Sequence, residues 1–298
     1  MISPEPLRVA VLGTGMIGMD LVHKIHRSAL LDCELVAGRN PRSAGLARAA
    51  ELGCPVSSEG IEAVLAAARP FDVVFDATNA HSHIEHWRRL EPLDTLLIDL
   101  TPSKIGQMVV PTVTGTRVPA HRNISLISCG GQASVPIVHA LARRFPTRYL
   151  EVVTTVASDI AGRATRLNLD EFVMTTQQAL SVFSGVADTK AIINISPAVP
   201  PATFRVAISA EVPDADAAAV HAVVAEAAEQ VRTFAPGYAV TACTVVDERV
   251  SISVEVSATS EVMPRHAGNL DIINAAAILV AEQYAAARDS AAMSGVAL

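Results

Sequence analysis

Apolar residues in the first third of the chain form short runs separated by stretches with helical spacing. The runs are RVAVLG, CELVAG, DVVFDAT and TLLIDL. The helical stretches cover about residues 16–31, 43–52, 59–68 and 84–90. Runs that are apolar on both faces need helices on both sides of a sheet. The pattern therefore predicts βαβ units that build a doubly wound parallel sheet, in an α/β fold.

After ISLISC (residues 124–129) the pattern changes to strands that alternate apolar and polar positions. These strands are YLEVVTTVAS, KAIINIS, TFRVAIS, AVTACTVV and VSISVEVS. Helical spacing at about 132–145, 169–184 and 214–234 supplies faces to cover them. We predict a first domain over residues 1–128, a second α+β domain over 129–267 with a mixed or antiparallel sheet, and a C-terminal helix within 268–298 that packs back on the first domain.

Composition narrows the range of partners. The 298 residues carry a formal net charge of −7 without a basic block, which argues against nucleic acid or an anionic membrane as a partner. The four cysteines form no CxxC pair, which is typical of reduced thiols inside a cell. The N-terminal sequence lacks the features of a signal peptide, and no apolar stretch is predicted to span a membrane. We expect a cytoplasmic protein.

A glycine motif follows the first predicted strand and opens the first predicted helix. Such a motif binds a dinucleotide, because one glycine makes the tight turn, one lets the backbone approach the pyrophosphate, and one packs the helix on the strand. Its residues are Gly13, Thr14, Gly15, Met16, Ile17 and Gly18. Strand before and helix after are the context that this motif requires, so we predict a nicotinamide dinucleotide as cofactor.

The second predicted strand does not end in the acidic residue that usually binds the ribose 2′-hydroxyl. It ends in Gly38-Arg39-Asn40, with Ser43 close behind. An arginine here accommodates a 2′-phosphate and favours NADP, whereas a solvated Arg39 with Asn40 on the ribose would favour NAD. Both cofactors remain open. Thr78 ends the DVVFDAT run, after which the nicotinamide is expected to pass, and is predicted to contact the cofactor.

Cys129 stands apart from the other three cysteines, which lie in or at apolar strands and are interpreted as small buried residues. It ends an apolar run, precedes Gly130-Gly131-Gln132, and opens a predicted helix. Amide groups and the positive end of a helix dipole lower the pKa of a thiol. We therefore predict that Cys129 is a catalytic nucleophile with a lowered pKa.

The chain resembles the bacterial CoA-acylating acetaldehyde dehydrogenases, partners of 4-hydroxy-2-oxovalerate aldolases in aromatic hydrocarbon catabolism. The matching stretches run from about residue 8 to 280 and include VAVLGTGMIGMDLVHKI, SCGGQASVPIVHAL, KAIINISPAVPP and HAGNLDIINAAA. The resemblance implies a Rossmann first domain, a catalytic and dimerising second domain, an acyl thioester on Cys129, coenzyme A as co-substrate, a homodimer, and possible assembly with an aldolase. It also implies cofactor contacts from the glycine motif, from Ser158 and Gly162 within the segment 158–168, and from Asn269.

The sequence departs from the family pattern at places that bear on chemistry. The family's Arg-Asp pair is Arg205-Val206 here, which removes a carboxylate, and His266 stands where the family has a tyrosine or similar residue before Ala-Gly-Asn. Imidazole exchanges protons near neutral pH. We predict that His266 is either a surface residue or a replacement acid/base group.

Asn168 and three histidines have competing interpretations. Asn168 lies three residues before Glu171, so it either caps a helix or donates a hydrogen bond to an oxyanion. His81, His83 and His86 follow the DVVFDAT run, but no cysteine or carboxylate set completes a tetrahedral metal site. We predict no metal, and a polar loop of these histidines lining the cofactor cleft.

The combined prediction is an enzyme that interconverts a short-chain aldehyde and its acyl-CoA thioester through Cys129 with NAD or NADP. One alternative is an NADPH-dependent biosynthetic reductase of a CoA- or carrier-protein-bound acyl thioester. The other is a non-catalytic dinucleotide-binding member of the family. Retention of the whole Cys-Gly-Gly-Gln run disfavours a binder, because a reactive thiol is a liability without catalysis.

Overall fold

The computed structural model describes residues 5–115 and 121–294. The chain divides into two compact units. Within the described residues, the first unit comprises 5–107, 121–126 and 274–294, and the second comprises 108–115 and 127–273. The short segment 108–115 thus belongs to the second unit, and the C-terminal helix begins in the second unit and continues into the first.

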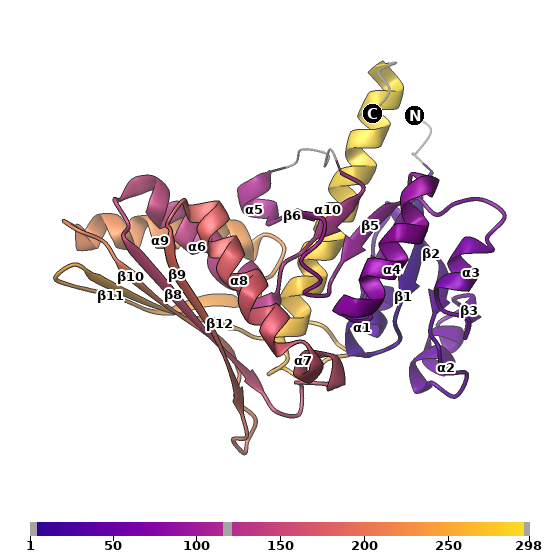
Figure 1. Ribbon diagram of the computed structural model, residues 1–298, viewed down its shortest axis with the longest axis horizontal. Helices are drawn as coiled ribbons and strands as arrows, with labels where there is room; N and C mark the ends of the chain where they lie inside the picture. The colour runs from indigo at the N-terminus through magenta and orange to yellow at the C-terminus, as the bar shows by residue number, and fades with distance from the viewer. Residues whose placement is uncertain (1–4, 116–120, 295–298) are drawn as a thin grey trace. The chain divides into compact units, whose positions relative to one another are not determined.

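The first unit is built on a largely parallel sheet in the order β3-β2-β1-β4-β5-β7-β6 (Figure 1). Parallel pairing joins β1 to β2 and β4, β2 to β3, and β5 to β4 and β7. The strands are β1 (Leu7–Leu12), β2 (Leu31–Ala37), β3 (Val56–Ser57), β4 (Val73–Asp76), β5 (Leu96–Asp99), β6 (Gln107–Met108) and β7 (Asn123–Ser125). Strand order reverses between β1 and β4, the position where doubly wound sheets bind ligands at their carboxyl ends. The predicted doubly wound fold is confirmed.

The helices of the first unit alternate with its strands, as the hydrophobic spacing predicts. They are α1 (Met16–Ile25), α2 (Ala44–Glu51), α3 (Ile61–Leu65), α4 (Ala80–Leu90), the 3-10 turn η1 (Glu91–Leu93), and most of α10 (Gly268–Ser294). The prediction of a first helix reaching residue 31 is wrong. The helix ends at Ile25, and Leu31 pairs with Leu7 as the first residue of β2.

The second unit contains a mixed five-stranded sheet in the order β11-β12-β10-β8-β9. Only β8 and β9 pair in parallel; the other pairs are antiparallel. The strands are β8 (Tyr149–Ala157), β9 (Asp188–Ser196), β10 (Phe204–Glu211), β11 (Tyr238–Val246) and β12 (Arg249–Val256). This sheet confirms the predicted α+β second domain.

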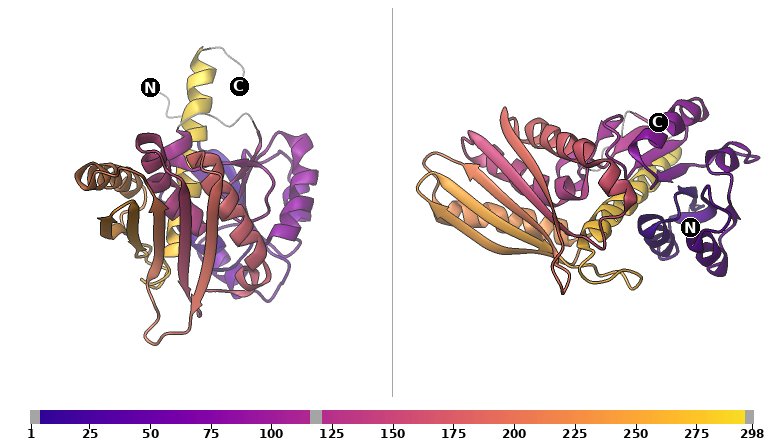
Figure 2. Two further views of the ribbon diagram at one scale, coloured as in Figure 1. Left: turned by 60° about the vertical axis from the view of Figure 1, so that its left-hand side comes forward. Right: turned by 60° about the horizontal axis from the view of Figure 1, so that its bottom comes forward.

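Helices cover one face of that sheet. The helices of the second unit are α5 (Pro111–Thr114), α6 (Cys129–Arg144), α7 (Arg163–Leu167), α8 (Leu169–Ser184) and α9 (Ala217–Arg232). The three long helices, α6, α8 and α9, pack on the strands. In β10 and β12 the residues that face these helices are buried, and the alternate residues are exposed or half-buried. No helix of the described part of the second unit covers the opposite face (Figure 2).

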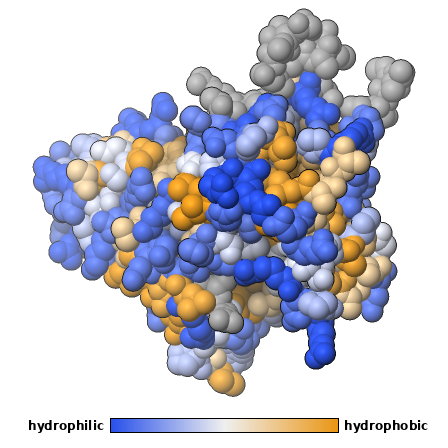
Figure 3. Space-filling model, turned by 45° about the vertical axis from the view of Figure 1, so that its right-hand side comes forward, coloured by the Kyte–Doolittle hydropathy of each residue, from blue (hydrophilic) through white to orange (hydrophobic). Residues whose placement is uncertain are grey.

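Helix α10 differs from the prediction that no segment could span a membrane. Its segment Gly268–Arg288 has a mean hydropathy of 1.3, and among the described helices it alone is long and apolar enough to cross a membrane. However, 67% of this apolar stretch is buried inside the structure, as it is in the core helix of a folded protein. On the face drawn in Figure 3, hydrophobic residues form small separate groups among hydrophilic ones.

Candidate functional site

The glycine motif in the first unit forms an open turn at the start of α1. Gly13 has a φ of +106°, a conformation that favours glycine, and an added Cβ would lie 2.5 Å from the carbonyl oxygen of Ala77. Around Gly15, by contrast, an added Cβ would meet no atom within 4 Å. Gly15 precedes the first helical residue, where backbone N–H groups have no partner within the helix. The turn therefore leaves space, amide donors and a helix dipole for a pyrophosphate.

Thr14 joins the glycine motif to the loop after β2. Its Oγ1 lies 2.7 Å from Oγ of Ser43, so the structure brings these two predicted cofactor residues together. Asn40 accepts a hydrogen bond from the backbone N–H of Arg42 at 3.0 Å and thereby shapes the same loop. Arg39 is exposed, and among the described residues no hydrogen bond or ion pair holds its guanidinium. An exposed guanidinium of this kind is able to bind a phosphate group.

The second predicted centre, Cys129, occupies a different place from the one expected. It does not end a strand: β7 ends at Ser125, and Cys129 is the first residue of α6. Between them Ile127 has a φ of +68°. This is a strained conformation for a β-branched residue, and such strain concentrates at functional sites. The turn therefore presents the cysteine at a helix N-terminus.

The two glycines after Cys129 are required by packing. An added Cβ at Gly130 would lie 2.3 Å from Oγ1 of Thr154 and 3.2 Å from Cζ of Phe172. At Gly131 it would lie 2.8 Å from Cγ2 of Ile127. Any larger residue would push the first turn of α6 away from β8 and from the strained Ile127.

Ser128 fixes the start of α6 through a short chain of hydrogen bonds. Its Oγ accepts from the N–H of Gly131 at 2.9 Å and lies 2.7 Å from Oγ1 of Thr176. Because Thr176 donates its proton to the carbonyl oxygen of Phe172 at 2.7 Å, the Ser128 hydroxyl donates to Thr176. Through these hydrogen bonds Ser128 connects the turn before Cys129 to α8, a contact that the sequence did not suggest.

The expectation of a lowered thiol pKa at Cys129 is wrong for this structure. The residue is partly exposed, but its side chain packs against the apolar core of the second unit. Burial raises the pKa of the Cys129 thiol to about 12, and the hydrogen bonds from the backbone of Gly130 and of Cys129 itself offset only part of that rise. At neutral pH the thiol is therefore protonated and needs a proton acceptor before it can attack.

The segment after β8 folds back on itself. Arg166 donates to the carbonyl oxygen of Ala161 at 2.9 Å and to Oγ of Ser158 at 2.9 Å. Gly162 precedes α7, with no atom within 4 Å of an added Cβ. Asn168 precedes α8, but its side chain makes no capping hydrogen bond there. The capping interpretation of Asn168 is therefore not realised, which leaves the oxyanion interpretation as a proposal.

Asn269 lies at the start of α10 with only 6% of its surface exposed. Its Oδ1 is buried without a hydrogen-bond partner among the described residues. A buried amide oxygen without a partner costs free energy unless a ligand completes it. This orphaned acceptor is the kind of group that a bound ligand satisfies.

His266 is paired with a residue that sequence reasoning missed. Its Nε2 lies 3.1 Å from Oδ2 of Asp159, and the imidazole side chain is 21% exposed. A carboxylate that orients an imidazole is the usual support of an acid/base histidine. Asp159 directly follows Ser158, in the segment implied to contact the cofactor, but its partner lies 107 residues away in the sequence. The proximity of the two could not be inferred without the fold.

Val206, at the position where a carboxylate was expected from the family resemblance, faces the helices rather than the open face of the sheet. It is fully buried in the core of the second unit. In the sheet it is the register partner of Thr154, the residue that contacts Gly130. Thr154 Oγ1 is buried without a hydrogen-bond partner among the described residues.

The three histidines after β4 do not form a loop, and that prediction is wrong. All three lie in α4, and only His81 is exposed. His83 and His86 are buried and bind Asp76 at the end of β4. Their neighbours are carboxylates and amides of adjacent strands, which no pattern in the sequence indicated. Within the described part of the chain, no group of three or more potential ligands could hold a metal ion.

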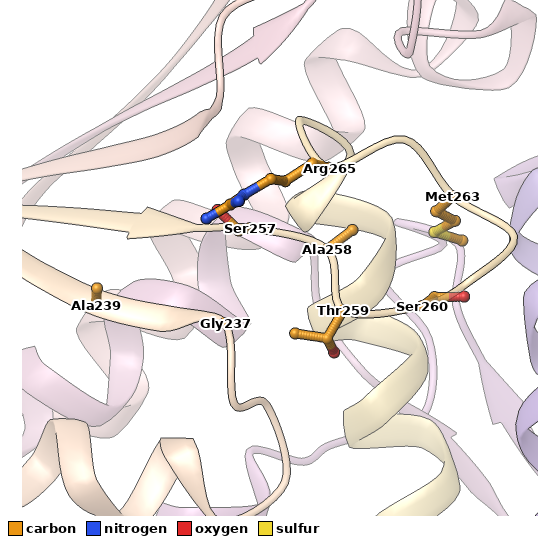
Figure 4. A pocket seen from close by; sticks show the side chains of 8 residues that line it. All are labelled: Gly237, Ala239, Ser257, Ala258, Thr259, Ser260, Met263 and Arg265. Atoms are coloured by element: carbon orange, nitrogen blue, oxygen red, sulfur yellow. The ribbon is translucent and has the colours of Figure 1, made fainter.

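A pocket of about 490 Å³ adjoins the loop that carries His266 (Figure 4). It lies between the start of β11 and the segment that joins β12 to α10. Its lining residues are Gly237, Ala239, Ser257, Ala258, Thr259, Ser260, Met263 and Arg265. Asp271 accepts hydrogen bonds from the backbone N–H and the hydroxyl of Thr259, at 2.7 and 3.0 Å, and so holds one wall in place.

Fold and site together define a class of protein. A doubly wound dinucleotide-binding unit, followed by an α+β unit with a cysteine at a helix N-terminus, is the organisation of nicotinamide-dependent dehydrogenases that act through a thioester. The fold resembles that of aspartate semialdehyde dehydrogenase II from Vibrio cholerae, solved in complex with ASA. The TM-score is 0.64 at 15% identity, over 94% of this chain and 100% of that one.

Sequence comparison gives the family. Residues 129–264 match the family described as prokaryotic acetaldehyde dehydrogenase, dimerisation. The chain is 68% identical to an acetaldehyde dehydrogenase of Streptomyces griseus, over 98% of this chain and 94% of that protein. It is 45% identical to one of Pectobacterium atrosepticum, over 95% and 97%. The chain belongs to the prokaryotic acetaldehyde dehydrogenase family, and the resemblance found in the sequence is confirmed.

Proposed function

We propose that this protein is a CoA-acylating acetaldehyde dehydrogenase, which interconverts a short-chain aldehyde and its acyl-CoA thioester. The observation that carries the proposal is the position of Cys129 at the first turn of α6, after the strained Ile127 and before two glycines that packing requires. The relatives, which are named acetaldehyde dehydrogenases, favour neither a carrier-protein reductase nor a non-catalytic binder.

In the oxidative direction the Cys129 sulfur attacks the aldehyde carbon, a C–S bond forms, and the carbonyl oxygen becomes an oxyanion. Amide groups at the start of α6 and the side chain of Asn168 stabilise that charge. A bound oxidised nicotinamide supplies the acceptor for the hydride that leaves the same carbon. The resulting thioester on Cys129 is attacked by the thiol of coenzyme A, which breaks the C–S bond and releases acyl-CoA.

Proton transfer is the step for which this chain needs its own solution. The Cys129 thiol starts protonated, because burial raises its pKa to about 12, and the buried Val206 cannot accept a proton. We assign this role to His266, oriented by Asp159 at 3.1 Å. The imidazole accepts a proton from the attacking thiol and returns one to the departing thiolate in the reverse direction.

For the cofactor, the glycine motif with Thr14, Ser43, Thr78 and Asn269 is the proposed binding set. Ser158 and Gly162 of the segment after β8 complete it by family resemblance. The unengaged Arg39 supports NADP, whereas NAD would bind through Asn40 if Arg39 stays in solvent. Coenzyme A is proposed as the co-substrate that accepts the acyl group.

We propose a homodimer formed through the open face of the second-unit sheet. Val153, Ala207 and Ser253 lie side by side at its centre, because Ala207 is in register with both of the others. The small side chains of Ala207 and Ser253 allow two sheets to approach closely. A cytoplasmic location is proposed from the four reduced cysteines, and an aldolase partner from the family resemblance alone.

The test follows the nicotinamide absorbance during incubation with acetaldehyde, coenzyme A and either NAD⁺ or NADP⁺. The parent protein should reduce the cofactor, and intact-protein mass after exposure to acetyl-CoA should show an acetyl adduct on Cys129. Cys129→Ala should lower the rate by at least about 1,000-fold, because removal of a nucleophile abolishes the covalent step, and should leave dinucleotide binding unchanged. An adduct on Cys33, Cys54 or Cys243 would contradict the assignment.

A further inference from the structure

Asp76 is a fully buried carboxylate at the carboxyl end of β4, and both of its oxygens are occupied. Oδ1 accepts the backbone N–H of Thr78 at 3.1 Å and the Thr78 hydroxyl at 2.5 Å. Oδ2 accepts Nδ1 of His83 at 2.9 Å and Nδ1 of His86 at 2.7 Å. A buried carboxylate with four donors around it is held in one orientation.

His83 is in turn fixed from the far side. Its Nε2 lies 3.2 Å from Oδ1 of Asn123 and its Nδ1 lies 3.5 Å from Oδ1 of Asp99. Both ring nitrogens therefore face acceptors, which favours an imidazolium that donates from both. Asp99 is itself held by the N–H of Thr101 at 2.7 Å and the hydroxyl of Ser103 at 2.5 Å. The network thus spans β4, β5, β7 and α4 of the first unit.

The electrostatics keep Asp76 ionised. Burial opposes the charged form, but hydrogen bonds from His83 and His86 outweigh it and hold the pKa of Asp76 below its usual range. The pKa of His83 is raised, because its interactions with Asp76 and Asp99 outweigh the effect of burial. At neutral pH an anion therefore always faces Thr78.

Thr78 connects this network to the glycine motif. An added Cβ at Gly13 would lie 2.5 Å from the carbonyl oxygen of Ala77 and 3.4 Å from the nitrogen of Thr78. Thr78 is partly exposed beside this turn. Because its proton is donated to Asp76, the hydroxyl oxygen can only accept a further hydrogen bond.

We propose that Asp76 is a positioning residue, which His83 and His86 hold so that the Thr78 hydroxyl accepts a hydrogen bond from the dinucleotide bound at the glycine motif. The donor would be a ribose hydroxyl or the carboxamide N–H of the nicotinamide half. The inference rests on the proposed function, since it needs a dinucleotide in this place. A purely structural network would tie α4 to the sheet without affecting affinity.

The experiment titrates the parent and its variants with NADH and with NADPH, following the fluorescence of Trp87, the single tryptophan of the chain. Thr78→Val, which removes the acceptor but keeps the shape, should weaken binding about 3- to 10-fold, the range for one hydrogen bond. Thr78→Ser keeps the hydroxyl and should therefore retain most of the affinity of the parent. Thr95→Val is the matched control: this threonine also donates a buried hydrogen bond, to the carbonyl oxygen of Phe71 at 2.9 Å, but at the opposite end of β5. The affinity of Thr95→Val for both dinucleotides should equal that of the parent.

Asp76→Asn and the double variant Asp76→Asn/Thr78→Val show whether Asp76 positions the Thr78 hydroxyl or only stabilises the fold. If Asp76 acts through Thr78, the double variant should bind no more weakly than the weaker single variant. Additive losses, or normal binding by Thr78→Val, would overturn the inference while the proposed function stands. A parent that binds neither dinucleotide would overturn both. If Asp76→Asn does not fold, the comparison of Thr78→Val with Thr78→Ser and Thr95→Val still decides.

Discussion

Two glycine-rich turns open a helix in this protein, and they use their glycines in opposite ways. At the start of α1, Gly15 faces open space, with no atom within 4 Å of an added Cβ. At the start of α6, the space beside Gly130 and Gly131 is already filled by Thr154, Phe172 and Ile127. The space beside the first turn is open to a ligand, whereas the space beside the second turn is filled by packed side chains.

The difference shows how similar local sequences acquire different chemistry. In the proposed function the amides of the first turn are themselves the binding groups, so side chains must be absent around them. In the second turn the functional group is a side chain, and the surrounding turn must be rigid enough to aim it. The strained Ile127 and the hydrogen bonds of Ser128 supply that rigidity.

The largest expected effect concerns the proton acceptor that the cysteine turn requires. His266→Gln should lower the rate of the chemical step by about 100- to 10,000-fold, the usual contribution of a general acid or base. The measurement is the single-turnover rate of the parent and of the variant under the same conditions. His221→Gln, at an exposed position in α9, is the control and should match the parent. A His266→Gln rate within about threefold of the parent would show that His266 is a bystander.

Gly130→Ala tests whether the second turn is packed as closely as the distances indicate. The new Cβ would overlap the Thr154 hydroxyl at 2.3 Å, so the free energy of unfolding should fall by about 1–3 kcal/mol, as for other overpacked cores. Urea denaturation measures the change. Thr154→Ala added to Gly130→Ala should recover part of the loss, because it removes the overlapping oxygen. Unchanged stability in the single variant would mean that the turn is not closely packed.

Gly15→Ala tests the opposite property of the first turn. The added methyl group meets no protein atom, so stability should stay within about 0.5 kcal/mol of the parent. It would, however, occupy the space that the pyrophosphate needs, and dinucleotide affinity should fall by about 10-fold, or 1.4 kcal/mol. Isothermal titration with NADH and NADPH gives the affinity. Equal affinity in the variant would place the pyrophosphate elsewhere.

The smallest expected effect is on the choice between the two cofactors at the first turn. Arg39→Ala should lower the ratio of NADPH to NADH catalytic efficiency about 5- to 10-fold, because the charge-assisted hydrogen bonds to the 2′-phosphate are lost. Arg42→Ala, an exposed arginine of the same loop, should leave the ratio unchanged. If the two variants behave alike, Arg39 is a solvated loop residue and NAD is the preferred cofactor.

Much of the fold and part of the site followed from the sequence, because they depend on neighbours along the chain. Hydrophobic periodicity predicted the doubly wound sheet, the α+β unit and helix α8 at its observed bounds. The glycine motif and the Cys-Gly-Gly run were recognisable because their turns are built from consecutive residues. The first helix was predicted too long, since only the pairing of Leu31 with Leu7 shows that β2 begins there.

What only the tertiary structure decided depends on residues that are far apart in the chain. Burial by the core of the second unit raises the pKa of Cys129, which local reasoning expected to be lowered by a helix terminus. The pairing of His266 with Asp159 spans 107 residues, and that of His83 with Asn123 spans 40. Desolvation and electrostatic pairing act through space, so a sequence determines the local frame of a site, while the electrostatic environment of its reactive groups is set by the residues that folding brings around them.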